Sequence, residues 1–339
     1  MRKDNNKNIT WEIVASIVIP VYNEEKYIEK CILSILNQDF DKNKMEVIFI
    51  DGNSEDKTKN IILSYCKKFP FISVLDNPKR KIQFGSNIGI RASNGKYIIR
   101  MDAHSEYAND YVSKNIEYLE KTGADNVGGP MIAKGKTPVQ KAIAAAYHSK
   151  FALGGGKFHD ENYEGYADTV YLGAFKRETL FALNLYDENI QCTDDDDLNY
   201  RIIENGGNIY ISPKIKSIYY PRSNYKNLFK QYFNYGLWKV AVIKKHKKPA
   251  RISHLVPITF VLFLMIGFIL SIFSKPFFYL FIFILSLYII LDLYFSFSNK
   301  YTHTFEDKLR LVLIHFILHV SYGTGFLTGI FKFLGYNSK

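Results

Sequence analysis

The chain has 339 residues, a formal net charge of +11 and only three cysteines, Cys31, Cys66 and Cys192. Cysteines so few and so scattered exclude a disulfide framework or a zinc site, and they fit a reducing compartment. The length allows one domain of roughly 200 to 250 residues together with a further segment. Residues 1–12 show no apolar signal region, so we expect that the first part of the chain is not secreted.

The first hundred residues alternate between β-rich apolar runs and helical patterns. Helices are expected at about 24–37, 56–68 and 84–93, between strands at 16–20, 47–50, 71–75 and 96–101. This alternation predicts an α/β domain with a mostly parallel sheet. Neither a Gly-x-Gly-x-x-Gly turn nor a P-loop occurs, so phosphate would be held by other means, of which a metal ion is the obvious one.

Polar residues directly follow three of these strands. Asn23 and Glu24 follow the first strand, Asp51 the second and Asp102 the fourth. Ligands of such sheets bind at the carboxyl ends of the strands, so a shared site is favoured over acids that serve only solubility. The motif Asp-x-His at 102–104 is either half of a metal site or an incidental acid with a surface histidine. Taken alone, this motif is weak.

The basic residues are concentrated in one segment. Residues 213–251 contain eleven lysines and arginines and no acid, which equals the net charge of the whole chain. This segment lies directly before an apolar run, where basic residues mark the cytoplasmic side of a membrane and attract anionic lipid headgroups. A nucleic-acid partner is not expected, because the segment adjoins a membrane span rather than a nucleic-acid motif.

Three apolar runs follow, at 255–273, 277–297 and 311–330, and Asp292 is their only formal charge. About 20 apolar residues cross a bilayer, so the first two runs are expected to be membrane helices. The third, with two histidines and three glycines, either crosses, lies along the interface or packs against the other two. Three core helices of a soluble protein are disfavoured, because no soluble partner of matching apolarity remains.

Four ordered segments resemble the motifs of family 2 glycosyltransferases: 16–38, 47–58, 87–107 and 193–207. The resemblance covers roughly residues 12–240. It is strongest to the branch of succinoglycan-type, membrane-associated glucosyltransferases, through "MDAHSEY", "DTVYLGAFKRE" and "YYPRSNYKNLFKQYFNYG". It implies a GT-A fold with a Rossmann-like, mostly parallel sheet and C-terminal transmembrane helices. The domains would be a cytosolic glycosyltransferase domain at 1–223, a basic amphipathic interfacial region at 224–251 and a membrane domain at 252–339.

The resemblance also implies a donor site. The nucleotide sugar, a UDP-sugar by preference, would be bound by Pro20, Tyr22, Glu24, Asp51, Arg80, Lys81, Asn87 and Asp102. Asp51 would accept a hydrogen bond from the base, and Asp102 matches the first aspartate of the family's Asp-x-Asp metal motif. Position 104 departs from that motif, because it is His. An imidazole ligand shifts the preference from Mg²⁺ toward Mn²⁺; alternatively, His104 binds the diphosphate and the metal is held by Asp102 alone.

The acidic run 194–197 matches the family's acidic motif, which implies Asp195 as the general base, with Asp194 as the second choice. One or two of these acids fit a solvated helix N-terminus, where the helix dipole favours negative charge. A single base indicates a single displacement with inversion at the sugar.

An acceptor or diphosphate role is implied for Arg222, Gln231 and Trp238, although "QYFNYGLW" lacks the arginine of the family's segment. The aromatic residues of this stretch equally describe an amphipathic helix lying on the membrane. Residues 149–159 resemble a mobile acceptor loop, and a flexible connector is the alternative.

Together with the apolar runs and the basic segment, this resemblance implies a metal-dependent, inverting hexosyltransferase at the cytosolic face of the cytoplasmic membrane. It would add one sugar to a lipid-linked saccharide in surface polysaccharide assembly. Two alternatives stay open: a polyprenyl-phosphate glycosyltransferase, and a non-catalytic membrane assembly protein that keeps the fold.

Overall fold

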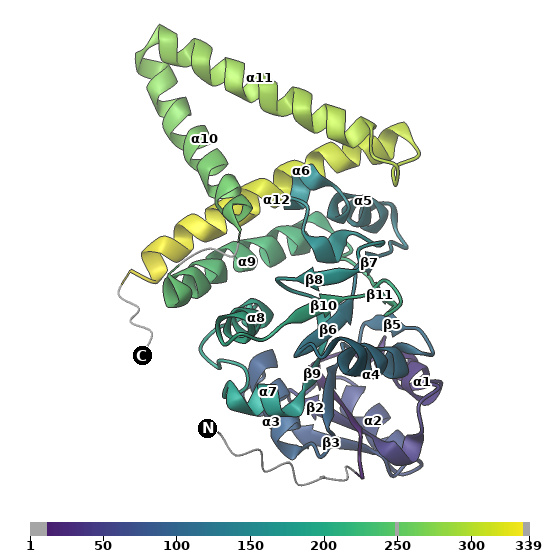
Figure 1. Ribbon diagram of the computed structural model, residues 1–339. Coiled ribbons are helices and arrows are strands. Elements are labelled where there is room, and N and C mark those ends of the chain that lie inside the picture. Colours follow the sequence, from purple (N-terminus) through teal and green to yellow (C-terminus); the bar gives the residue numbers. More distant parts are fainter. Residues whose placement is uncertain (1–11, 248–250, 335–339) are drawn as a thin grey trace. The chain divides into compact units, whose positions relative to one another are not determined.

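The computed structural model describes residues 12–247 and 251–334 (Figure 1). The N-terminal stretch 1–11 and part of the basic segment, 248–250, lie outside the described residues. The described chain forms two compact units. Unit 1 comprises Met1–Gly129, Glu164–Glu188 and Arg201–Ser217, and unit 2 comprises Pro130–Tyr163, Asn189–Tyr200 and Ile218–Lys339.

Unit 1 is built on an eight-stranded sheet with the order β3-β2-β1-β4-β9-β6-β10-β8. The strands are β1 (Ala15–Val21), β2 (Met45–Asp51), β3 (Ile72–Asp76), β4 (Tyr97–Arg100), β6 (Asn126–Gly129), β8 (Gly165–Ala167), β9 (Tyr171–Lys176) and β10 (Ile209–Ile211). The pairs β1–β2, β1–β4, β2–β3 and β6–β10 are parallel. Strand β9 runs antiparallel to both β4 and β6, and β8 runs antiparallel to β10. The prediction of a mostly parallel α/β sheet is therefore confirmed.

The other elements of unit 1 are the helices α1 (Ile28–Leu36), α2 (Thr58–Cys66), α3 (Ile82–Ala92), α4 (Tyr111–Thr122) and α7 (Arg177–Ala182), a short 3₁₀ turn at Lys42–Lys44 and the strand β5 (Ser105–Tyr107). The first helix was expected from about residue 24 but begins at Ile28. The backbone N–H of Glu24 donates to Thr58 Oγ1 at 2.7 Å, and that of Glu25 donates to Asp56 Oδ2 at 3.1 Å. The backbone N–H groups of Tyr27 and Ile28 both donate to the Glu24 carbonyl oxygen at 2.9 Å, so residues 24–27 form a turn that precedes α1.

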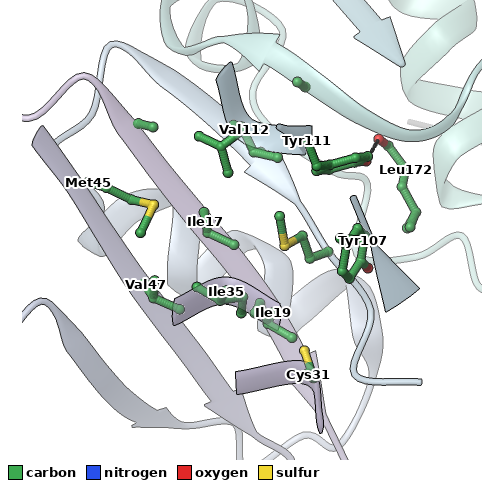
Figure 2. Close-up of a cluster of buried hydrophobic side chains, with 14 of the residues drawn as sticks. Ile17, Ile19, Cys31, Ile35, Met45, Val47, Tyr107, Tyr111, Val112 and Leu172 are labelled. Carbon is green, nitrogen blue, oxygen red and sulfur yellow. Dashed lines mark hydrogen bonds between the residues drawn. The ribbon is translucent and has the colours of Figure 1, made fainter. Parts of the chain in front are cut away.

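The core of unit 1 lies between this sheet and the helices α1 and α4 (Figure 2). Ile17 and Ile19 of β1 and Ile35 of α1 are almost completely buried. Strand β1 is buried on both faces and is apolar except for Ser16, as is typical of a parallel strand covered on both sides. Each such side chain stabilises the fold by roughly 1.5–3 kcal/mol. The strand ends that carry the polar residues are therefore fixed to a rigid support.

Unit 2 is mainly helical. Its elements are α5 (Pro138–Tyr147), α6 (Lys150–Leu153), a 3₁₀ turn at Lys157–His159, the first half of α8 (Asp194–Glu204), α9 (Tyr225–His246), a 3₁₀ turn at Ile252–Leu255, α10 (Val256–Phe273), α11 (Lys275–Phe297) and α12 (Phe305–Lys332). Strand β7 (Ile132–Ala133) pairs in parallel with Ile218 and Tyr219 of β11 (Ser217–Tyr219).

Three helices of unit 2 are long and apolar enough to cross a membrane: Ile252–Phe273, Lys275–Phe297 and Phe305–Lys332. They cover the three predicted apolar runs. The first two expose large apolar side chains, such as Phe273 at 80% and Phe283 at 66%. Helix α12 is more buried and packs against α9 and α10.

Glycines allow α9 and α12 to approach each other closely. A Cβ atom at Gly325 would lie 2.0 Å from the backbone oxygen of Phe233, and one at Gly236 would lie 2.0 Å from the oxygen of Tyr322. Small residues have this function where membrane helices meet. Much of the apolar face of α9, including Leu228 and Tyr232, is buried. That the remaining surface of α9 lies on a membrane stays a prediction.

Candidate active site

Asp51 is the last residue of β2 and is completely buried. Its Oδ2 accepts a hydrogen bond from the backbone N–H of Ser54 at 3.0 Å. Its Oδ1 is buried and has no hydrogen-bond partner among the residues that the structure describes. A buried carboxylate oxygen without a donor is costly, so the site is suited to a ligand that brings its own N–H or O–H group.

Asn77 lies beside Asp51 and extends this arrangement to the end of β3. Its backbone N–H donates to the Asp51 carbonyl oxygen at 2.7 Å, and its Nδ2 donates to the Lys81 carbonyl oxygen at 2.9 Å. Its Oδ1 is a second buried oxygen for which the described residues provide no partner. A Cβ atom at Gly85 would lie 3.1 Å from Asn77 Nδ2 and 3.3 Å from Pro20 Cβ. Pro20, Asn77 and the first turn of α3 therefore form one closely packed wall.

Tyr22 and Arg80 form the open side of this region. The Tyr22 side chain is exposed. The Arg80 guanidinium lies over its ring, with 5.6 Å between Arg80 Cζ and the ring centroid. Arg80 has a positive φ of 57° and contacts Glu55 Oε1 through Nη1 at 3.1 Å. An exposed aromatic ring beside a buried carboxylate can stack on a flat heterocycle whose edge reaches Asp51.

Two further predicted donor residues lie on α3 and at its start. Lys81 is the exposed N-cap residue of α3, whereas Asn87 is buried in the helix. The Asn87 amide donates to the Tyr186 carbonyl oxygen at 2.9 Å and accepts from the Tyr186 N–H at 3.0 Å. It also donates to Glu188 Oε1 at 3.2 Å. Asn87 thus holds the segment 186–188 in place, and its direct contact with a nucleotide stays a prediction.

Asp102 follows β4, and its backbone is fixed by Tyr107. The Tyr107 hydroxyl accepts from the Asp102 N–H at 2.6 Å and donates to the Asp102 carbonyl oxygen at 3.1 Å. Burial, and next the charge of Asp102, raise the pKa of the Tyr107 phenol well above its ordinary value, so this donor stays protonated. The same two causes, with Glu24, raise the pKa of the Cys31 thiol to about 12, so this thiol is protonated at neutral pH in the metal-free chain.

His104 lies beside Glu24, with 3.2 Å between Nδ1 and Glu24 Oε1. The loops after β1 and β4 thus bring a second carboxylate close to the Asp-x-His motif. Among residues 12–247 and 251–334, no group of three or more His, Cys, Asp or Glu is arranged to hold a metal ion. Metal ions in nucleotide sites usually take one or two protein carboxylates, and phosphate oxygens supply other ligands. Asp102 and His104 fit a metal of that kind.

In unit 2, the acidic run at the start of α8 is divided between two environments. Asp196 forms an ion pair with the buried Lys239 of α9. Asp197 is completely buried, and its Oδ1 lies 2.7 Å from Lys245 Nζ and 2.9 Å from His246 Nε2. Two of the four acids therefore connect α8 to α9, a role that the interpretation as a solvated helix N-terminus did not include. Asp194 is buried and Asp195 is half-buried, and these remain the candidate bases.

The residues predicted to contact the acceptor, on α9 and directly before it, lie in different surroundings. Gln231 Nε2 donates to the Tyr235 hydroxyl at 3.0 Å and contacts the Tyr219 hydroxyl at 3.4 Å. Gln231 Oε1 is buried and finds no partner in the described part of the chain. Trp238 instead packs on Phe333, at the end of α12, with the ring centroids 5.3 Å apart. Arg222 is exposed.

The family model for glycosyl transferase family 2 matches residues 16–176. A relative from Methanococcus voltae is 34% identical over 238 residues, which are 68% of this chain and 74% of that protein. Its name is dolichyl N-acetyl-alpha-D-glucosaminyl phosphate 3-beta-D-2,3-diacetamido-2,3-dideoxy-beta-D-glucuronosyltransferase. The succinoglycan biosynthesis protein ExoA of Rhizobium meliloti is 32% identical over 244 residues, 71% of this chain and 74% of that protein. This chain belongs to glycosyltransferase family 2.

Solved structures give the fold of this glycosyltransferase. The mannosyltransferase PcManGT from Pyrobaculum calidifontis matches with a TM-score of 0.59 and 14% identity, covering 96% of this chain and 91% of that chain. Residues 1–349 of S. aureus TarS match with a TM-score of 0.50 and 15% identity, covering 96% and 93%. Identities this low show the fold alone, and that fold is the predicted GT-A fold.

The sequence interpretation of this glycosyltransferase missed two residues of the site. Asn77 directly follows β3, as the polar residues of the other strand ends follow theirs, so the strand-end argument could have found it. Tyr107 is part of the quoted motif "MDAHSEY", but nothing in its spacing shows that its hydroxyl returns to the backbone of Asp102. That contact depends on β5, a strand of only three residues.

Proposed function

We propose that this glycosyltransferase moves one sugar from a UDP-sugar to a lipid-linked saccharide during surface polysaccharide assembly, with inversion at the sugar. The observation that carries the donor half is the buried Asp51 Oδ1, which lacks a partner among the described residues. The imide N–H of uracil is a donor of the required kind. Tyr22, with its exposed ring, is placed to stack on such a base.

The diphosphate of the donor would be held at the end of β4. A divalent cation bound by Asp102 and His104 would neutralise the charge that develops on the departing nucleoside diphosphate. The imidazole ligand favours Mn²⁺ over Mg²⁺. The solved mannosyltransferase of this fold contains GDP-Man and Mn²⁺, which supports a cation of this class. In this chain, Tyr107 holds the Asp102 backbone, which fixes the point from which the carboxylate projects.

Asp195 is the proposed general base. It accepts the proton of the acceptor hydroxyl while that oxygen forms a bond to the anomeric carbon. The bond from this carbon to the diphosphate oxygen breaks, and its electron pair leaves with the nucleoside diphosphate. Asp195 is half-buried and lies in the first turn of α8, within the acidic motif of the family. A single base fits a single displacement, which gives a β-linkage from an α-linked donor.

The acceptor half of the proposal rests on the relatives and on the apolar helices. The Methanococcus voltae relative is named for a dolichyl phosphate-linked sugar, and ExoA is named for succinoglycan. Three helices long enough for a bilayer and the basic segment 213–251 support a membrane location with the catalytic residues on the cytosolic side. Anionic lipids would bind the basic segment. Gln231 and Arg222 would contact the acceptor, together with the segment Ser149–His159.

The acceptor can be tested directly with purified full-length protein in detergent. The protein would receive a panel of nucleotide sugars and either polyprenyl phosphate or a polyprenyl-pyrophosphate-linked saccharide. We expect the mass of the linked saccharide to rise by one sugar. Transfer to bare polyprenyl phosphate would identify the alternative transferase. The absence of both transfer and donor hydrolysis would support a non-catalytic assembly protein. The presence of Asp51, Asp102 and Asp195 argues against that alternative.

A further inference from the structure

Helices α11 and α12 contain five polar side chains that meet within unit 2. We call this set the α11–α12 polar cluster, and it consists of Tyr288, Asp292, Ser296, His315 and His319. Asp292 is 2% exposed, His315 is 0% exposed and His319 is 8% exposed. Ionisable groups inside apolar helices are costly and occur where they have a specific task. The proposed function uses none of these residues.

Asp292 fixes His315 within the cluster. Asp292 Oδ1 lies 2.7 Å from His315 Nδ1 and accepts a hydrogen bond from Ser296 Oγ at 3.1 Å. The oxygen of an ionised carboxylate can accept a hydrogen bond but cannot donate one, so His315 Nδ1 carries the hydrogen. This places the His315 ring with its edge against the ring of Phe151, with the centroids 5.3 Å apart.

His319 holds the backbone of the same residue. His319 Nε2 lies 2.9 Å from the Phe151 carbonyl oxygen, and His319 Nδ1 lies 3.0 Å from the Tyr288 hydroxyl. A carbonyl oxygen can only accept, so Nε2 carries the hydrogen. In the neutral ring Nδ1 then accepts from Tyr288, which fixes both the tautomer and the orientation of His319.

Phe151 fills the space between these groups. Its ring lies 5.5 Å from Tyr288, 5.4 Å from Phe295 and 5.1 Å from His319, measured between centroids. Phe151 belongs to α6, which has only four residues. A helix this short is not stable by itself, because nucleation costs more than one turn of hydrogen bonds provides. The position of α6 therefore depends on contacts with its neighbours, and Phe151 provides those with the rings of α11 and α12.

The segment after α6 begins with a glycine turn that is hydrogen-bonded to α6. Gly154 and Gly155 have φ values of +67° and +72°, and the Gly154 N–H donates to the Lys150 carbonyl oxygen at 3.0 Å. A Cβ atom at Gly154 would lie 2.9 Å from Ser253 Cβ, and one at Gly156 would lie 2.6 Å from Arg251 Nη1. The glycine turn thus runs directly against the residues that precede α10.

We propose that the α11–α12 polar cluster holds α6 through Phe151 and thereby positions the segment Ser149–His159 for the lipid-linked acceptor. Phe151 and His319 are positioning residues in this proposal. Apolar side chains would suffice to pack α11 on α12, but a hydrogen bond to a carbonyl oxygen gives a directional hold that packing does not. The membrane helices would then set the place at which the saccharide meets the base. The inference rests on the proposed function, because it assigns that segment to the acceptor.

Limited proteolysis tests the hold without any substrate. Lys150 and Lys157 flank the glycine turn and are exposed, so trypsin cleavage there reports how often the segment opens. In detergent-solubilised full-length protein, we expect His319→Leu to raise this cleavage rate at least fivefold. His319→Gln, whose amide can still donate to the carbonyl oxygen, would stay within twofold of the wild type. The matched control is His303→Leu, at an exposed histidine outside α11 and α12. Equal cleavage rates for His319→Leu and the wild type would overturn the proposal.

Kinetics test the consequence for the reaction. We expect His319→Leu and Phe151→Leu to raise the KM for the lipid-linked saccharide at least tenfold and to change the donor KM and the donor hydrolysis rate less than twofold. His319→Gln would restore the acceptor KM to within threefold. Equal changes in both KM values would contradict a positioning role. If wild-type protein transferred sugar to no lipid-linked acceptor, the proposed function would fail, while the cleavage rates would still decide whether the cluster holds α6.

Discussion

At the scale of single residues, the donor site rests on oxygens that have been buried without a partner. Asp51 and Asn77 lie at the ends of neighbouring strands, and each has one buried oxygen that no described group satisfies. In the proposed donor complex, N–H groups of the base would donate to these oxygens. Asp102 is placed differently: the fixed part is its backbone, held by Tyr107, and its carboxylate is half-buried at the strand end.

The substitution Asp51→Asn separates binding from stability. The introduced amide can still accept from the Ser54 N–H through its oxygen, but its NH₂ group then presents a donor to the base. A lost hydrogen bond to a charged group is worth about 1.5–3 kcal/mol, so the KM for the UDP-sugar should rise about 10- to 100-fold. The thermal midpoint of the ligand-free protein should not fall, because a buried charge has been removed.

The control for this change is Asp76→Asn, at the exposed end of β3, where Asp76 forms a surface ion pair with Lys59. Donor titration and thermal unfolding of both variants give the comparison. A donor KM that is equally affected in both variants, or unaffected in Asp51→Asn, would show that Asp51 does not contact the base.

At the scale of elements, α9 connects the acidic motif to the apolar helices of unit 2. Lys239 and Lys245 of α9 bind two of the four acids of α8, and the glycines of α9 and α12 bring these helices together. The first turn of α8, which carries Asp195, is therefore held by a helix that lies well beyond it in the sequence.

Lys239→Met should lower kcat at least tenfold and leave the donor KM within twofold of the wild type. The change leaves Asp196 without its cation at a largely buried site, which displaces the first turn of α8. Lys230→Met, at an exposed position of the same helix, is the matched control. Adding Asp196→Asn to Lys239→Met should recover part of the lost kcat; no recovery in steady-state kinetics would argue against the ion pair as the cause.

Gly325→Leu tests the contact between α9 and α12. A side chain at this position meets the backbone oxygen of Phe233, so the helices must separate. Overpacking of this kind destabilises by about 1–3 kcal/mol or more, and we expect a lower thermal midpoint in detergent. Thr328→Leu, at an exposed position of the same helix, should leave the midpoint unchanged. If both variants had the same thermal midpoint as the wild type, that result would contradict the close packing of α9 on α12.

At the scale of the whole molecule, the sequence predicts what local patterns encode. Apolar runs between polar turns located the first four strands of the sheet, and apolar length located the three long helices. Helix α1 begins later than expected, because residues 24–27 form a turn whose position is set by bonds of Glu24 and Glu25 to residues far along the chain. The placement of strand β9 between β4 and β6 also depends on tertiary contacts that leave no local signal in the sequence. The same is true of the ion pairs that Asp196 and Asp197 form with cations of α9.

The measurement that most directly tests the account is metal-dependent release of nucleoside diphosphate from a panel of nucleotide sugars. Full-length protein in detergent, with a lipid-linked saccharide present, would be compared with Asp102→Asn and with the Asp76→Asn control, in Mn²⁺, in Mg²⁺ and after chelation. We predict turnover of a UDP-sugar that is faster with Mn²⁺, is lost on chelation and falls at least about a hundredfold in Asp102→Asn alone. Release that is indifferent to both the metal and Asp102 would contradict the proposed donor site.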